Sequence, residues 1–576
     1  MTASNISLLP ALPLLIGAIV MALLPKRLRS PAFLFFPLVT LAVVWTTPLG
    51  SVLQHNFLGY DLILGEFTRL NRLFGTIFAL IAFIGGVYGF HRSEAAHQSA
   101  ALLYAAGALG LTFAGDFFTL FVFWEIMAVA STYLVWARRT RESEQAGMRY
   151  LLVHLFGGGL LMLGILLHVS QSGSIELQTF PEASSLAAWL ILAGVALNTA
   201  IPPLHAWLAD AYPKATVGGA VFLSAFTTKS AVLILMKLFA GWEILLYAGV
   251  IMALYGVVYA VLANDIRGIL AYHIISQVGY MVAAVGIGTE MALNGASAHA
   301  FSHILYKSLL FMGAGVVIET TGKSKLTELG GIAKSMPIVL WLYMIGAFSI
   351  SGFPLFNGFI SKSMVVAAAG KAHYDTAMLL LLLASVGTFL HTGLKLPYFT
   401  WWSKAQSDLK PTRTPVNMMI AMGMAAFFCT LFGVVPGLLY DYLPYPVDYK
   451  PYTLYHLTES VQILLFTFIA FWLLRGKLAG EPYLPIDTDW LYRKPGAWLA
   501  RHLVIWVESI FAACERGITW MTESLVTTSQ SPLSWLTRNN KHYTDPNESR
   551  SPLQVELLLV VATIIGIAWV MIATLT

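Results

Sequence analysis

Long apolar runs separated by short polar connections follow one another along almost the whole chain. A helix needs about 20 mainly apolar residues to cross the hydrocarbon core of a bilayer. The pattern therefore predicts an all-α membrane protein with about sixteen transmembrane helices. The runs lie near residues 6–24, 31–48, 72–90, 98–114, 116–137, 148–169, 185–206, 217–240, 243–263, 267–288, 294–318, 337–369, 376–401, 416–440, 455–475 and 553–575.

Two of these runs are interrupted by proline. Pro202 and Pro203 stand in "LNTAIPPLHAW", and Pro354 stands in "SISGFPLFNGF". Proline frees backbone carbonyls, which at membrane depth must be buried in protein or face a water-filled cavity. Interrupted helices in both halves of a chain are typical of inverted repeats built around an ion path. We therefore expect two broken helices.

The C-terminal part has a different pattern. After residue 476 comes a polar stretch, and residues 495–526 then carry Arg501, Glu508, Glu515 and Glu523 about every seven residues on an otherwise apolar background. This stripe predicts an amphipathic helix that lies along a protein or membrane surface. It is either a lateral docking arm, held by the anchor helix at 553–576, or a simple interfacial helix.

Composition narrows the class of protein. The chain has 576 residues, of which 57% are hydrophobic and 11% charged, whereas soluble domains carry about 25% charged residues. The net charge of +5 is scattered, so no basic surface for nucleic acid is expected. Two cysteines, Cys429 and Cys514, exclude a cysteine-rich iron–sulfur or zinc site. No cofactor is expected.

The first apolar run does not resemble a cleaved signal. No basic residue precedes it, and Lys26, Arg27 and Arg29 follow it. The positive-inside rule then predicts a multi-pass protein of the cell membrane whose N-terminus is outside. The topology after residue 369 is left open, because the interrupted run can be counted in two ways.

Ionisable residues stand inside several spans, where each charge costs about 2.5–3.5 kcal/mol at the helix centre. His299, His303 and Lys307 are four residues apart, which places them on one helix face. Buried groups of these types exchange protons near neutral pH, so the set predicts a proton path. Its members are Glu125, Lys229, His273, His299, His303, Lys307 and Lys362.

Other polar residues in the spans have simpler interpretations. Asp116 is expected to cap a helix, and Lys237 and Lys395 are expected to extend towards the membrane interface. His205, which follows the double proline, either caps freed carbonyls or takes part in the path.

Six stretches in order carry a resemblance to a known family. They are "GDFFTLFVFWEIM", "PPLHAWLADAYPKAT", "FLSAFTTKSAV", "DIRGILAYHIISQVGYM", "HAFSHILYKSLLFMGAG" and "GFPLFNGFISK". Over roughly residues 100–400 the chain resembles the antiporter-like membrane subunits shared by respiratory complex I, Mrp-type cation/proton antiporters and membrane-bound hydrogenases. It is most similar to the D-type subunits of Mrp antiporters.

The resemblance implies two inverted five-helix repeats, each with a broken helix, and a charged chain along the middle of the membrane. It implies that Glu125 serves the first half-channel, Lys229 links the halves, the His299–His303–Lys307 helix serves the second, and Lys362 releases protons. The domains expected are N-terminal helices (1–97), first repeat (98–240), second repeat (241–401), additional helices (402–476), polar linker with lateral helix (477–552) and anchor (553–576).

One position departs from the family's pattern. A lysine usually stands seven residues before the position of His205 and pairs with the glutamate, but here that position is Asn198. Either Glu125 finds another cation, such as Lys229, or the first half works differently.

Three functions are compatible with these features. The first is a proton-translocating subunit of a larger complex, coupled to exchange of Na⁺ or K⁺ or, alternatively, to a redox-driven pump. The expected partners are other membrane subunits and the bilayer, and any redox catalysis would lie in those subunits, so the chain itself is not expected to be an enzyme. The second is a stand-alone solute or anion transporter, and the third is an inactive scaffold, which the retained Glu125, Lys229, Lys307 and Lys362 argue against.

Overall fold

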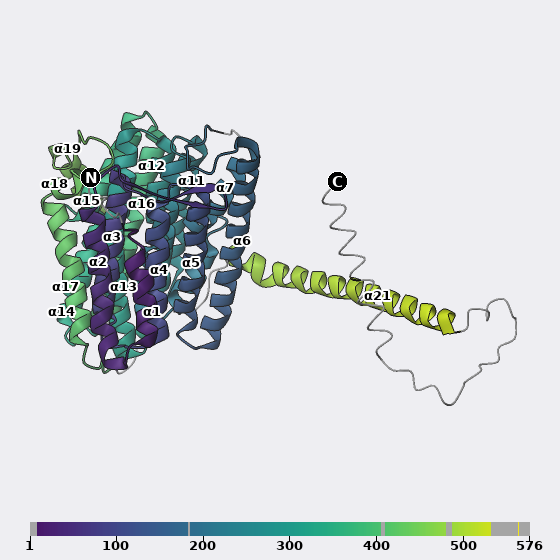
Figure 1. Cartoon of the computed structure of the whole chain (residues 1–576). Helices are drawn as coiled ribbons and strands as arrows, with labels where there is room; N and C mark the ends of the chain where they lie inside the picture. Colours follow the sequence, from purple (N-terminus) through teal and green to yellow (C-terminus); the bar gives the residue numbers. More distant parts are fainter. Residues whose placement is uncertain (1–7, 183–184, 405–408, 480–486, 531–562, 564–576) are drawn as a thin grey trace. The chain divides into compact units, whose positions relative to one another are not determined.

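The computed structural model describes residues 8–182, 185–404, 409–479, 487–530 and 563. It contains two compact units, Met1–Tyr492 and Arg493–Thr576. The first unit holds a set of helices that stand side by side (Figure 1). Of the predicted anchor at 553–576, all but Thr563 lies outside the described residues.

The first unit begins with helices and a hairpin. The chain begins with helices α1 (Leu12–Leu23) and α2 (Lys26–Thr46). Strands β1 (Val52–Phe57) and β2 (Tyr60–Glu66) follow in sequence, and helix α3 (Arg69–Tyr88) comes next. The strands are antiparallel, with Val52 opposite Glu66 and Phe57 opposite Tyr60. The purely α-helical prediction missed this hairpin. Ile63 N donates to the Asp116 carboxylate over 2.7 Å, which fastens the hairpin to the start of α5.

Two successive stretches of chain each contain two helices, then a 32-residue helix and then a broken helix. The first contains α4 (Ala95–Phe113), α5 (Phe117–Trp136), α6 (Arg141–Ser172), α7 (Leu186–Thr199), α8 (Ala206–Ala211), the 3₁₀ turn η1 (Tyr212–Lys214), α9 (Val217–Ala225) and α10 (Thr227–Leu238). The second contains α11 (Glu243–Leu262), α12 (Ile266–Ile287), α13 (Glu290–Thr321), the 3₁₀ turn η2 (Leu326–Glu328), α14 (Pro337–Ser351), α15 (Asn357–Lys371), α16 (Asp375–Thr388) and the π-helical segments η3 (Phe389–Lys395) and η4 (Tyr398–Trp402).

Local details of the two stretches also correspond. Helices α6 and α13 have 32 residues each. The helices before them are capped by Asp116 and Asp265, whose side chains accept backbone N–H groups of the first turn. Each of these aspartates forms an isolated β-bridge, Asp116 with Glu176 and Asp265 with Lys325. The division into repeats at 98–240 and 241–401 stays a prediction.

Both predicted breaks are present. Helix α7 ends at Thr199 and α8 begins at Ala206, while α14 ends at Ser351 and α15 begins at Asn357. Trp207 Nε1 donates to the freed carbonyl of Leu197 over 2.9 Å. In the second break, Lys362 Nζ donates to the Ile350 carbonyl over 2.8 Å. In each break a side chain beyond it therefore donates to one carbonyl at the end of the preceding helix.

The chain continues with α17 (Val416–Val434), α18 (Gly437–Tyr440) and α19 (Leu454–Leu474), then α20 (Asp489–Leu491), the π-helical η5 (Tyr492–Gly496) and α21 (Ala497–Gln530). Helix α21 has 34 residues, which confirms the predicted helix at 495–526. That it lies along a surface stays a prediction.

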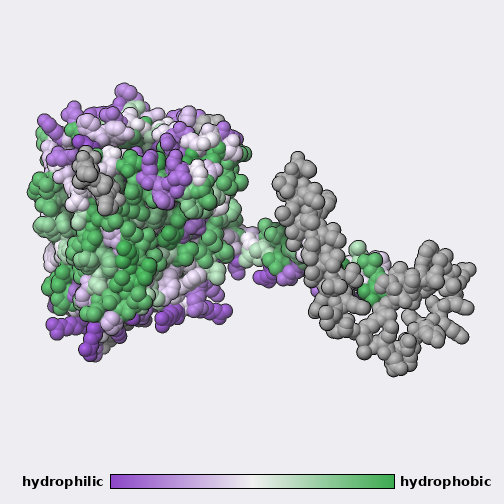
Figure 2. Space-filling view, viewed as in Figure 1, coloured by the Kyte–Doolittle hydropathy of each residue, from purple (hydrophilic) through white to green (hydrophobic). Residues whose placement is uncertain are grey.

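The apolar character of the helices agrees with a multi-pass membrane protein. Among the described residues, 12 helices are long and apolar enough to span a membrane, and α1, α7 and α14 are shorter apolar helices. The count of about sixteen crossings stays a prediction. Figure 2 shows hydrophobic residues over most of the visible side of the first unit, with hydrophilic residues at its two ends.

The centre of the first unit is formed by the helices that carry the predicted path. The apolar windows of α12 and of α9–α10 are 100% buried, and that of α13 is 94% buried. By contrast, 28% of the window in α2 and 17% of that in α19 are buried, so these helices lie at the periphery.

Candidate functional site

Helix α13 presents three titratable side chains to the protein interior. His299, His303 and Lys307 are all fully buried. The rings of His299 and His303 lie 6.4 Å apart between centroids. Within the described part of the chain, Lys307 Nζ and both ring nitrogens of His303 have no hydrogen-bond partner. The three side chains stand on one helix, as predicted, and the polar atoms of His303 and Lys307 are not engaged in structural bonds.

Lys362 lies at one end of this group. Its Nζ is 5.3 Å from the ring centroid of Tyr280, and that ring lies 5.8 Å from His299. His299 Nδ1 is also 3.1 Å from Ser361 Oγ, beside Lys362 in the sequence. Two neighbours on α12 and α15 thus connect His299 to Lys362.

Lys229 lies at the other end. Its Nζ donates to the Ser224 carbonyl and to Thr228 Oγ1, the second over 3.1 Å. Ser224 Oγ is 3.5 Å from Ser308 Oγ, and Ser308 adjoins Lys307. Lys229 and Lys307 interact electrostatically. We call the set Lys229, Lys307, His303, His299 and Lys362 the central file.

His273 forms a branch beside the central file. Its ring lies 5.6 Å from that of His391, and none of the four ring nitrogens has a partner among the residues described. One turn further along α12, Gln277 Nε2 donates to Thr388 Oγ1 over 3.2 Å. Tyr306 OH lies 3.5 Å from Gln277 Oε1 and 3.4 Å from His299 Nε2.

A small cavity adjoins Lys362. It has a volume of about 30 Å³, and its lining includes Lys362, Ser385, Glu459 and Ser460. A water molecule needs about 10–15 Å³ measured in this way, so the cavity has room for water. Glu459 belongs to α19 and is half-buried. The cavity thus places a carboxylate beyond the last lysine of the central file.

Several of these polar neighbours were not predicted from the sequence. Gln277 and Tyr280 follow His273 by four and seven residues, so their helical spacing was a usable signal. Ser361, Ser385 and Glu459 meet the path only through packing between helices, for which a single sequence has no signal.

Glu125 lies apart from the central file. It is half-buried on α5, and its Oε1 has no hydrogen-bond partner in the described segments. This oxygen points at Gly158 of α6: a Cβ placed on that glycine would lie 2.0 Å from it. Among the described residues Glu125 forms no salt bridge with Lys229, whose Nζ bonds to Ser224 and Thr228. That Lys229 is the cation for Glu125 stays a prediction.

Asn198 is fully buried near the end of α7. Neither its Oδ1 nor its Nδ2 has a hydrogen-bond partner among the described residues. The preceding Leu197 packs against Gly157 of α6, next to the glycine that faces Glu125. A buried polar group without a hydrogen-bond partner lowers the stability of the fold by about 1–3 kcal/mol. The Asn198 amide therefore does not stabilise the fold through its hydrogen bonds.

His205 does not cap the freed carbonyls of its broken helix. It has no side-chain capping bond, and Trp207 takes the Leu197 carbonyl instead. His205 Nε2 lies 3.2 Å from Oδ1 of Asp487, which belongs to the segment before α20.

The other interpretations have mixed outcomes. Asp116 caps α5, as predicted, by accepting from Thr119 N over 2.8 Å. Lys395 does not extend to the interface: it is buried, and its Nζ donates to the Val261 carbonyl over 2.6 Å. Lys237 likewise donates to the carbonyls of Thr112 and Ala114, each over 3.1 Å. Both lysines satisfy carbonyls near helix ends.

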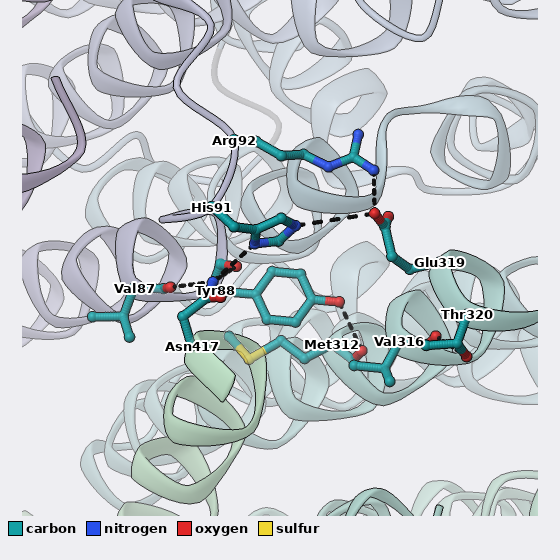
Figure 3. Close-up of polar contacts among 9 residues, drawn as sticks. All are labelled: Val87, Tyr88, His91, Arg92, Met312, Val316, Glu319, Thr320 and Asn417. Carbon is teal, nitrogen blue, oxygen red and sulfur yellow. Dashed lines mark hydrogen bonds and ion pairs between the residues drawn. The ribbon is translucent and has the colours of Figure 1, made fainter. Parts of the chain in front are cut away.

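A second polar cluster joins α3, α13 and α17 (Figure 3). Glu319 pairs with Arg92 and lies 4.0 Å from His91 Nε2. Asn417 Nδ2 is 3.1 Å from the Val87 carbonyl, 2.8 Å from the Tyr88 carbonyl and 2.9 Å from His91 Nδ1. Tyr88 OH donates to the Met312 carbonyl over 2.9 Å. These bonds hold the ends of three helices together.

The central file suits proton transfer between neighbouring side chains. Lysine and histidine side chains can each gain or lose a proton. In the described ranges, no group of three or more His, Cys, Asp or Glu side chains is placed to hold a metal ion.

The chain is similar in sequence to known proteins. The family described as "NADH:quinone oxidoreductase/Mrp antiporter, TM" matches residues 114–390. The D component of a Na⁺/H⁺ antiporter from Alkalihalophilus pseudofirmus is 30% identical over 352 residues, which are 56% of this chain and 71% of that protein.

Solved structures show the same fold. The Mrp complex from Dietzia sp. contains a chain that superposes with a TM-score of 0.67 at 24% identity, covering 82% of this chain and 99% of that one. A membrane-bound sulfane sulfur reductase, an archaeal respiratory membrane complex, gives a TM-score of 0.69 at 23% identity, covering 97% and 99%. The chain therefore belongs to the family of NADH:quinone oxidoreductase and Mrp antiporter transmembrane subunits.

Proposed function

We propose that the chain is a proton-translocating, antiporter-type subunit of a multi-subunit membrane complex and that it exchanges H⁺ for a monovalent cation, Na⁺ or K⁺. The observation that carries this proposal is the central file: five buried titratable side chains contributed by three separate stretches of the chain. The chain acts as a transport subunit, and any redox chemistry belongs to its partners.

The electrostatics of the central file favour a moving charge over a fixed one. Lys229 and Lys307 are fully buried and Lys362 is 5% exposed, and none of them forms a salt bridge with a described residue. Buried charges repel each other strongly in a low-dielectric interior. Protonation of one lysine therefore disfavours protonation of the next. This repulsion favours the passage of a proton along the central file.

Lys362 is the exit of this path in our proposal. The cavity that it shares with Glu459 and four serines offers room for water and a carboxylate to receive a proton. We place the protein in the cell membrane, with its N-terminus outside, on the basis of the basic residues that follow the first apolar run.

The driving partner separates two versions of the function. The relatives include subunits of Na⁺/H⁺ antiporters, and a component of hydrogenase-4 from Escherichia coli is also 30% identical, over 369 residues. Small antiporter subunits that co-purify with the chain would favour cation exchange. Quinone-oxidoreductase or hydrogenase subunits would favour a redox-driven pump.

The test replaces Lys307, the middle of the central file. Lys307→Met keeps an unbranched side chain of similar length but cannot carry a proton, so we expect normal assembly and transport reduced about tenfold or more, which equals at least ~1.4 kcal/mol on the barrier. Lys307→Arg is expected to fail as well, because a guanidinium does not release its proton at accessible pH.

The measurement is proton and cation flux in proteoliposomes that contain the whole complex. Lys334→Met, at an exposed lysine, is the matched control and should transport normally. Normal flux in Lys307→Met would refute the proposed proton path.

A further inference from the structure

A carboxylate from beyond α19 reaches the break in the first broken helix. His205 lies in that break and is fully buried, and Asp487 is 7% exposed. The two residues are 282 positions apart in sequence, yet His205 Nε2 is 3.2 Å from Asp487 Oδ1. The chain thus returns to the first half of the protein after the last long helix of the first unit.

Asp487 accepts hydrogen bonds from several directions. Tyr255 OH of α11 donates to Oδ1 over 2.5 Å, and Tyr272 OH of α12 donates to Oδ2 over 2.7 Å. The backbone N of Thr488 donates to Oδ1 over 2.6 Å. Burial opposes ionisation, but the bonds and charge of His205, together with the two tyrosines, hold the pKa of Asp487 well below its ordinary value.

This arrangement fixes the His205 ring. Its Nε2 faces an ionised carboxylate, and its plane lies against Tyr255, with 4.5 Å between ring centroids. The opposite nitrogen, Nδ1, is buried and has no partner among the residues that the structure describes. A histidine whose one nitrogen donates to a carboxylate has its other nitrogen set in place as a proton acceptor.

The first half lacks one expected proton carrier, and a histidine held in this way can take its place. Asn198, seven residues before His205, stands where the resemblance leads one to expect a lysine, and its amide cannot carry a proton. Glu125 has no salt bridge with a described residue. The His205–Asp487 contact is located at the break itself, and it is an ion pair only when His205 is protonated.

We propose that Asp487 is a positioning residue for proton transfer in the first half: it holds His205 by accepting its Nε2–H, so that Nδ1 takes up and releases the transported proton in place of the missing lysine. This inference rests on the proposed function. In each cycle a water-borne proton forms the Nδ1–H bond, Asp487 balances the resulting imidazolium, and the same bond breaks when the proton passes on.

The other titratable groups around the pair come from α11, α12 and α20. They are Tyr255 and Tyr259, whose rings stack 4.4 Å apart, then Tyr272, and Asp489, which acts electrostatically on Tyr272. Loss of the Asp487 charge therefore makes a proton on His205 less favourable, with no other described acid bonded to the ring.

The experiment compares Asp487→Asn with Asp487→Ala in proteoliposomes of the whole complex, with flux measured across a range of pH. Asparagine keeps the size and the acceptor oxygen but loses the charge. We expect normal assembly, flux reduced about tenfold in both variants, and an alkaline limb of the pH profile displaced to lower pH in Asp487→Asn. The double variant His205→Gln/Asp487→Asn should lose no more than either single variant.

Normal flux and an unchanged pH profile in Asp487→Asn would overturn the inference, even if Asp487→Ala failed, because only packing would then be required. If Asp487→Asn does not assemble, Tyr272→Phe is measured instead, because it keeps the carboxylate and removes one of its hydrogen bonds. A displaced pH profile of flux in Tyr272→Phe supports the inference, and an unchanged profile overturns it. Lys307→Met, measured in the same vesicles, separates a failure of this inference from a failure of the proposed function. If it fails while Asp487→Asn transports normally, this inference alone is wrong, and if both transport normally, the proposed function is wrong.

Discussion

Glu125 occupies the space above Gly158, where a side chain would otherwise stand. A Cβ at residue 158 would lie 2.0 Å from Glu125 Oε1, which is far closer than any normal contact. The glycine therefore admits the carboxylate to the surface of α6, next to the α7 segment that contains Asn198.

Gly158→Ala tests whether this position of the carboxylate matters. The new methyl group must displace the Glu125 head, and we expect flux to fall by about tenfold with assembly retained. Gly159→Ala is the matched control, because a Cβ there meets no atom within 4 Å. It should leave flux unchanged and favour the helix by up to about 1 kcal/mol. Equal flux in the two variants would show that the Glu125 position is unimportant.

Glu125→Gln tests the charge at the same place. The carboxylate has no described hydrogen-bond partner at Oε1, so its removal should not disturb folding, whereas a neutral amide cannot accept the transported proton. We expect intact complexes with strongly reduced ion-driven pH gradients in vesicles. Glu144→Gln, at an exposed position on α6, serves as the control. Unchanged gradients in Glu125→Gln would remove this residue from the path.

Asn198→Lys restores the amine that the family usually has. Asn198 is fully buried on α7, where the preceding Leu197 packs against Gly157, next to the glycine that faces Glu125. A cation there stabilises an ionised Glu125 and adds a second proton carrier. We expect retained transport with a displaced pH optimum. A pH profile identical to that of the unaltered protein would indicate that Asn198 faces away from the path.

The His91 cluster predicts a pH-dependent stability. The Val87 and Tyr88 carbonyls fix Asn417 Nδ2 as a donor, so His91 Nδ1 accepts and the ring is neutral. Burial lowers the pKa of His91, although Glu319 pulls it upwards. A group whose folded pKa is lowered stabilises the fold fully above its unfolded value of about 6.5. That contribution declines as the pH falls through this value towards the folded pKa.

The apparent Tm of the purified complex, followed from pH 8 to pH 5, measures this effect. In His91→Gln the decline should be smaller than in the unaltered protein. His55→Gln, on the exposed hairpin, should leave the decline unchanged. Parallel curves for the unaltered protein and His91→Gln would contradict the assigned neutral ring.

The sequence predicted features that lie within one element better than contacts between elements. The row His299–His303–Lys307 follows from the four-residue spacing alone, and both broken helices follow from proline. The β1–β2 hairpin was missed because it occupies a connection between two apolar runs. Asp487 was missed because its partners His205, Tyr255 and Tyr272 are more than 200 residues away. Only the packed structure brings these groups together.

The equal length of α6 and α13 lets their residues be compared position by position. Counted from Arg141 and from Glu290, His154 and His303 both stand fourteenth, and Gly158 and Lys307 both stand eighteenth. If the two stretches arose by duplication of one ancestral segment, they have since specialised in opposite directions at one site. At this position α13 carries the amine of Lys307, whereas α6 carries Gly158, which leaves room for the carboxylate of Glu125 from the neighbouring helix α5.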